Sequence, residues 1–151
     1  MGNLPVLAVL LRHLPADAQQ RQRVLDCVDS DAHVMGSVRS ADVVGHTAVS
    51  LACLDRSPEG AAPDAALPVV RLLLEAGASP NIPVRYSRSS ALNEACAGRQ
   101  PRPELVRLLV EKNANVDQRT SHGGWTALHT AAEYGDVHTV LQLAEMGAGS
   151  S

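Results

Sequence analysis

The residues able to do chemistry are few and widely spaced. The six histidines lie at no spacing that would bring two of them, or one of them and a cysteine, onto one metal ion. His122-Gly123-Gly124 has the composition of an oxyanion-hole loop, but a turn leading into a helix cap at Thr126 explains these residues better. The sequence has no glycine-rich phosphate loop and no nucleophile elbow. We therefore expect no catalytic residue, no metal ion and no cofactor.

The three cysteines do not indicate chemistry either. Cys53 and Cys96 end two similar phrases, Thr47–Cys53 and Ser90–Cys96, and a third such phrase has Ala132 at the same position. This equivalence indicates small packing residues rather than nucleophiles, with a reactive thiol as the weaker alternative. Cys27 has no base near it in the sequence.

Composition limits both the fold and the partner. The 151 residues are 45% hydrophobic but only 2% aromatic, which favours packed helices with Leu, Val and Ala in the core over a β-sandwich. The formal net charge of −3 excludes a generally basic surface for nucleic acid or membrane. The apolar start, residues 4–11, is too short to span a membrane. We expect a monomeric protein in the cytoplasm, with the nucleus as the alternative, that binds neither nucleic acid nor membrane.

The elements that carry these residues are internal repeats. Three phrases opening at Thr47, Ser90 and Thr126 are each followed by a Leu/Val-rich run, and they start 43 and 36 residues apart. Each opening hydroxyl predicts a helix N-cap, and the Gly or Asn after each second run predicts a left-handed C-cap. The pattern therefore predicts a helix-turn-helix unit repeated along the chain.

These phrases resemble the ankyrin repeat family. Its Thr-Pro-Leu-His-x-Ala-Ala signature is matched best by residues 126–132, and its Leu-Leu-x-x-Gly-Ala ending by residues 73–78, followed by Asn81. The resemblance covers residues 41–148 and implies an all-α fold with short β-hairpin fingers. The expected architecture is an ankyrin-repeat solenoid of about four helix-turn-helix units, the first of them degenerate.

We expect one domain over residues 1–151, divided into unequal units. Residues 1–40 form a degenerate N-terminal capping unit with a helix capped at Asp17, and residues 41–78 a repeat with a long inter-helix loop at 55–64. Residues 79–114 and 115–148 form the middle and C-terminal repeats. Thr139 and Gln142 replace apolar residues of the preceding repeats. We expect them to make the face that a further repeat would cover more polar.

The resemblance implies a non-catalytic module that binds another protein or peptide along a concave surface of hairpins and inner helices. It gives His129 a structural role, hydrogen bonding to neighbouring turns. In the first full repeat the variable positions of the family fall on Val43, Val44, His46, Leu54 and Asp55. In the middle repeat the candidates are Arg85, Tyr86, Arg88, Ser89, Ala97 and Arg99. In the last repeat they are His122, Gly123, Trp125, Glu133 and Tyr134.

Two features of this set bear on the partner. All three aromatic residues of the chain belong to it, and we expect Trp125 to lie next to Tyr134 as an interface anchor rather than a hairpin brace. A row of arginines could select an acidic or phosphorylated partner, and solvated loop charges are the alternative. These are Arg39, Arg85, Arg88 and Arg119. The chain is then a freestanding adaptor or inhibitor, or the recognition domain of a larger protein such as a ubiquitin ligase, where it would serve as substrate receptor or regulator.

Overall fold

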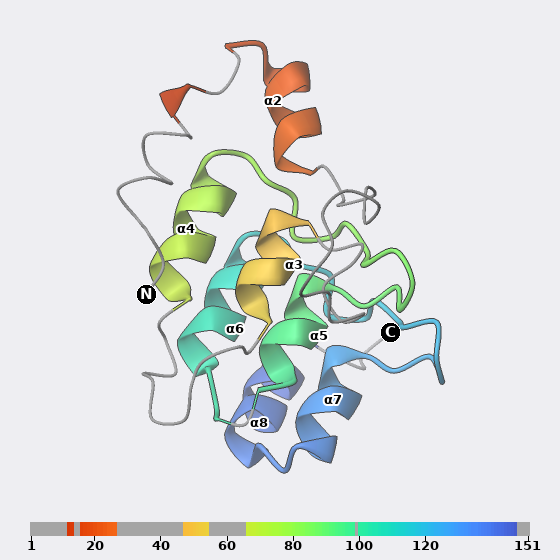
Figure 1. The fold of residues 1–151 in the computed structure, drawn as a ribbon. Coiled ribbons are helices and arrows are strands. Elements are labelled where there is room, and N and C mark those ends of the chain that lie inside the picture. The colour runs from red at the N-terminus through yellow and green to blue at the C-terminus, as the bar shows by residue number, and fades with distance from the viewer. Residues whose placement is uncertain (1–11, 14–15, 27–46, 55–65, 99, 148–151) are drawn as a thin grey trace, which may run out of the picture.

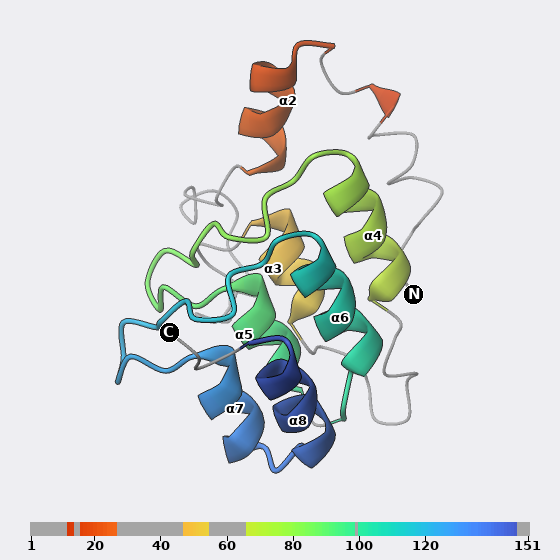
Figure 2. The same cartoon turned by 180° about the vertical axis from the view of Figure 1, so that it is seen from behind.

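The computed structural model describes residues 12–13, 16–26, 47–54, 66–98 and 100–147. Six of its helices form three antiparallel pairs stacked along one axis (Figure 1). The pairs are α3 (Ala48–Cys53) with α4 (Leu67–Glu75), α5 (Ala91–Cys96) with α6 (Pro103–Glu111), and α7 (Ala127–Glu133) with α8 (Val137–Glu145). The shorter helices α3, α5 and α7 form an inner layer, and α4, α6 and α8 form an outer one (Figure 2). The repeated helix pair predicted from the sequence is confirmed.

The inner helices begin where their hydroxyl residues predict. Thr47, Ser90 and Thr126 are the N-caps of α3, α5 and α7. The Thr47 hydroxyl accepts from the amide of Ser50 at 3.2 Å, and the Ser90 hydroxyl accepts from the amide of Asn93 at 3.1 Å. These bonds satisfy amides that the first helical turn leaves without an internal acceptor.

The outer helices begin and end by equally local chemistry. A proline stands in the first turn of both α4 and α6, where its missing N–H costs nothing. All three outer helices are followed by a residue with positive φ: Gly77 at 107°, Asn113 at 66° and Gly147 at 93°. Gly and Asn tolerate this conformation best, so the predicted helix ends are confirmed.

The core lies between the two layers and is built from aliphatic side chains. Leu92, Leu105, Leu109 and Leu143 are its largest members with no exposed surface. Cys53 and Cys96 belong to the same cluster, so their interpretation as small packing residues is confirmed.

The last outer helix corrects one expectation. Thr139 is only 1% exposed, and the side-chain amide of Gln142 donates to the carbonyl oxygen of Pro103 in α6 at 3.0 Å. Both therefore turn toward the preceding helices, and the expectation that they make the face a further repeat would cover more polar is wrong. Val137 and Leu141 are the large apolar residues of α8 that are exposed, at 68% and 59%.

The N-terminal unit is described only in part. Helix α2 (Ala18–Leu25) begins at the expected cap, where the Asp17 carboxylate accepts from the amide of Gln19 at 3.4 Å. It lies beyond α4 at one end of the stack (Figure 1), and Asp26 accepts from the amide of Ser79 at 2.8 Å. The expected loop at 55–64 lies outside the described residues.

Candidate functional site

Two fingers project from the helix layers, residues 79–89 and 115–125. Val84 donates from its amide to the carbonyl of Ser89 at 2.8 Å, and Thr120 donates to the carbonyl of Trp125 at 2.9 Å. The amide of Trp125 donates to the hydroxyl of Thr120 at 3.1 Å rather than to its carbonyl. A side chain therefore replaces the second backbone hydrogen bond that a β-hairpin would have here. Over the described residues the expected β-hairpin fingers are therefore hydrogen-bonded turns, without β-strands.

The two fingers are tied to each other. The amide of Ser121 donates to the carbonyl of Ser87 at 2.8 Å, and its hydroxyl lies 3.1 Å from the carbonyl of Tyr86. At the base, Asn81 donates from its side-chain amide to the carbonyl of Asn113 at 2.8 Å and accepts from the amide of Asn115 at 2.7 Å. Neighbouring repeats therefore hold their fingers in a fixed relative position.

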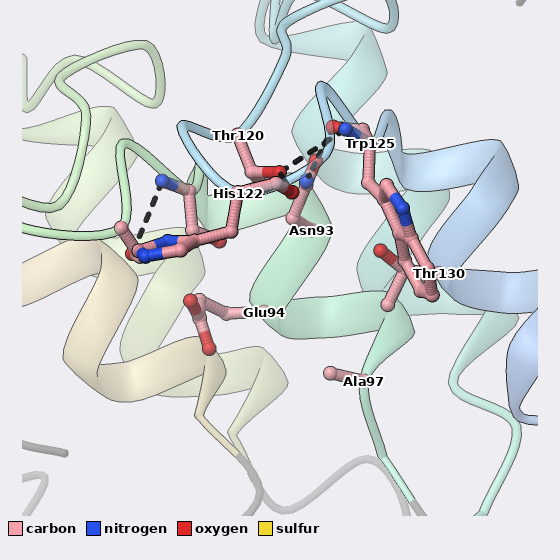
Figure 3. Close-up of a pocket in the computed structure, with 9 residues that line it drawn as sticks. Asn93, Glu94, Ala97, Thr120, His122, Trp125 and Thr130 are labelled. Atoms are coloured by element: carbon pink, nitrogen blue, oxygen red, sulfur yellow. Dashed lines mark hydrogen bonds between the residues drawn. The ribbon is translucent and has the colours of Figure 1, made fainter.

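A hollow of about 240 Å³ opens where these fingers meet the inner helices (Figure 3). Finger residues form one side of it, and residues of α5 and the cap that follows it form the floor. The lining comprises Ser87, Ser89, Asn93, Glu94, Ala97, Thr120, His122, Trp125 and Thr130. In Figure 3 the rings of His122 and Trp125 stand apart, with Glu94 and Ala97 below them.

Trp125 is both a lining residue and part of the finger. Its side chain is 38% exposed, and its ring centroid lies 6.5 Å from that of His129, with the ring planes tilted by 31°. A Cβ added at Gly123 would lie 2.8 Å from the indole nitrogen, so the turn leaves just enough room for the ring. Trp125 and Tyr134 stand at opposite ends of α7, and the expected contact between them is therefore wrong.

The other predicted site residues divide between the hollow and its surroundings. Ser89, Ala97, His122 and Trp125 are brought together in the lining. Arg85, Arg88 and Tyr86 are exposed on the finger, Tyr86 at 64%, while Glu133 and Tyr134 are exposed at the far end of α7. Leu54 is half-buried at the C-cap of α3 and does not line the hollow. The other candidates lie outside the described residues: Arg39, Val43, Val44, His46, Asp55 and Arg99.

Sequence reasoning missed Glu94, the one lining residue with a carboxylate. It stands four residues after its helix cap, as Leu51 and Thr130 do in the neighbouring repeats. Glu94, Leu51 and Thr130 differ in type, although the residues around them are alike from repeat to repeat. This variation was the signal in the sequence that could have identified the position. The family positions used for prediction skipped this one, because they lie at the ends of the inner helix.

The chemistry of the remaining polar groups is structural. His129 accepts at Nδ1 from the amide of Thr126 at 3.2 Å, so its role is structural, but among the residues that the structure describes its ring bonds to the N-cap of its own helix and not to a neighbouring turn as expected. Burial raises the pKa of both Cys53 and Cys96 from 9.0 to about 12, so at neutral pH both are protonated and unreactive. Within the described ranges no three metal-ligating side chains gather, and no helix there has the length and apolarity to cross a membrane.

Arg102 is the least expected of these groups. It is 5% exposed and lies between inner helices of successive repeats. Its guanidinium donates to the carbonyl of Cys53 at 2.8 Å and to that of Glu94 at 2.9 Å. Both carbonyls lie near the C-terminal ends of their helices, where oxygens lack helical partners and the helix dipole favours a cation. Arg102 therefore fastens the floor of the hollow to the preceding repeat.

Comparison with known proteins gives one result for the family and one negative result. A comparison with curated protein sequences gives no match. The family model of ankyrin repeats in three copies matches residues 59–150, more than half of the chain. This match covers the described helices from α4 to α8. The chain therefore belongs to the ankyrin repeat family, whose repeats generally mediate protein–protein interaction.

Proposed function

We propose that this protein is a non-catalytic module that binds a partner protein or peptide across its fingers and inner helices. The observation that carries the proposal is the hollow, because it joins side chains from two successive fingers to the inner helix between them. A surface of this kind is concave, partly apolar and held in place by hydrogen bonds, as binding sites usually are.

The exposed aromatic residues support the same proposal. Tyr86, Trp125 and Tyr134 remain 64%, 38% and 51% exposed. Tyr and Trp are enriched among residues that dominate binding energy at interfaces, since they bury much area at little entropic cost. We infer that the partner covers these side chains.

The fingertip arginines support an acidic partner. Arg85 and Arg88 are exposed, and within the part of the chain that the structure describes neither guanidinium makes a hydrogen bond or an ion pair; the only bond of Arg88 there is from its backbone amide to the carbonyl of Val84 at 2.8 Å. Arg119, on the next finger, makes only a 3.4 Å contact with the carbonyl of Gly124. Guanidinium groups recognise carboxylates and phosphates through paired hydrogen bonds. We infer that acidic groups of the partner lie opposite the fingers.

Site-specific photo-cross-linking tests the binding surface. A photoreactive phenylalanine derivative is placed at Tyr86 or at Tyr134, and, as matched controls, at Arg71 or at Leu141 on the outer helices. All four positions are exposed, so the core is not disturbed. In extract from the source cell, we expect the first pair to cross-link one common protein and the control pair not to. Cross-links from the control pair alone, or equally from all four positions, would refute the proposal.

A further inference from the structure

The hollow carries a negative charge that has no counterpart in its own lining. Glu94 is the only Asp or Glu among the lining residues, and no Lys or Arg is among them. The backbone carbonyl of Glu94 accepts from Arg102, but its carboxylate has no hydrogen bond or ion pair in the described ranges. A half-buried carboxylate left in this state favours an incoming cation.

The neutral polar groups of the lining also favour a guest that donates hydrogen bonds. The hydroxyl of Thr120 donates to the carbonyl of His122 at 2.9 Å, and that of Thr130 donates to the carbonyl of Thr126 at 3.3 Å. The Asn93 amide nitrogen points to the carbonyl of Trp125 at 3.5 Å. These donors are engaged within the protein, while the hydroxyl oxygens keep acceptor capacity.

The shape and chemistry of the guest follow from the aromatic ring that lines the hollow across from this carboxylate (Figure 3). Trp125 borders the hollow with a partly exposed indole, the best aromatic surface for a cation. A guanidinium is planar, stacks on aromatic rings and offers five N–H donors, whereas a lysine ammonium offers three and stacks less well. An acidic guest would be repelled by Glu94, and an apolar guest would bury its carboxylate without a partner.

We propose that the hollow receives an arginine side chain of the partner, with its guanidinium held by Glu94 in the space that Trp125 borders. This assignment rests on the proposed function, and it specifies the residue that anchors the partner. Together with the arginines of the fingers, it describes a partner segment in which one arginine is flanked by acidic residues. The carboxylates would face the fingertips while the arginine enters beneath them.

Nuclear magnetic resonance of the full chain tests this with defined probes. The indole N–H of Trp125 gives one unambiguous signal, because the chain has a single tryptophan. The probes are acetyl-Gly-Gly-Arg-Gly-Gly-amide and the same peptide with citrulline, which keeps the shape and removes the charge. A single side chain of this size binds on roughly the millimolar scale. We expect a saturable shift with the arginine peptide and binding at least about tenfold weaker with citrulline.

Matched variants locate the interaction. Glu94→Gln should weaken the arginine peptide about tenfold or more, whereas Glu145→Gln, at an exposed site on α8, makes the same charge change and should leave binding unaltered. Backbone amide spectra report that both variants are folded. Equal responses to the two peptides, unchanged binding in Glu94→Gln, or no shift at all would overturn the proposal.

This result is separable from that of the cross-linking experiment. If Tyr86 and Tyr134 cross-link one protein while the arginine peptide fails, the binding surface stands and its anchor is not an arginine. If the peptide binds while cross-linking fails, the hollow is a guanidinium site and the proposed partner surface is wrong.

Discussion

The position of Arg102 predicts a strong energetic coupling to Gly98. A Cβ added at Gly98 would lie 2.9 Å from Nη2, 3.0 Å from Nε and 3.2 Å from Cζ of Arg102. Real Cβ atoms are rarely that close to another heavy atom, so the guanidinium would have to move. It is buried, and its two hydrogen bonds to Cys53 and Glu94 fix it on its other sides. Any movement therefore gives up at least one of them.

The magnitude follows from that lost bond. A hydrogen bond with a charged partner contributes about 1.5–3 kcal/mol, so Gly98→Ala should cost roughly 2 kcal/mol. The lower entropy of the unfolded alanine chain offsets this by about 0.4–1 kcal/mol, which leaves a net cost of about 1–2 kcal/mol. In an Arg102→Met background the obstacle is absent, so the same substitution should stabilise slightly. The coupling energy is then about 2 kcal/mol.

The assay is a double-mutant cycle by urea unfolding, followed by far-ultraviolet circular dichroism. Gly135→Ala supplies the matched control, since Gly135 has φ of 71° and no atom within 4 Å of an added Cβ. Its cost of about 1–2 kcal/mol comes from the backbone alone and should be the same with or without Arg102. A Gly98–Arg102 coupling below about 0.5 kcal/mol, no larger than that of the control, would refute the reasoning.

Three further predictions follow from single contacts. Cys53 and Cys96 should react with a thiol reagent at pH 8 only after unfolding. Because the pKa of about 12 in the folded protein exceeds the unfolded value of 9.0, their contribution to stability should be complete below pH 9 and decline as the pH rises toward 12. This decline should be smaller in Cys→Ala variants. Asn81→Ala removes two hydrogen bonds between repeats and should lower stability by about 1–2 kcal/mol, seen as a fall in Tm of roughly 3–6 °C. Trp125→Ala should weaken partner binding by roughly 2 kcal/mol and reduce the cross-link yield from Tyr86, with helical circular dichroism preserved. An unchanged cross-link yield would mean that the ring stabilises the finger and does not contact the partner.

The parts of the fold that the sequence predicted are those decided by local chemistry. A hydroxyl at Thr47 or Ser90 caps a helix through bonds to the next turn, and Asn113 or Gly77 ends one through its own backbone. Such signals act over three or four residues, so they are visible without knowledge of the packing. Their recurrence was enough to identify the architecture.

The features that escaped prediction depend on contacts between repeats. Arg102 lies between two prolines and would ordinarily be exposed, yet it is buried because Gly98 makes room and two carbonyls accept hydrogen bonds from it. One is that of Glu94 in its own repeat, and the other is that of Cys53 in the preceding one. Gln142 turns inward for a similar reason, since Pro103 leaves a carbonyl that it can reach. A prediction from residue type alone places both side chains at the surface, because Arg and Gln are usually exposed. Only their partners, many residues away, decide otherwise.

The same inter-repeat contacts explain why the hollow suits binding. Its lining comes from two consecutive repeats, residues 87–97 and 120–130, so its shape depends on how firmly those repeats are joined. Asn81 and Ser121 join them on the finger side, and Arg102 joins the shared inner helix to the repeat before it. A surface fixed before the partner arrives loses little conformational entropy when it binds. If the hollow binds the partner as proposed, the buried arginine and the finger hydrogen bonds should therefore act on affinity as well as on stability, although none of them lines the hollow.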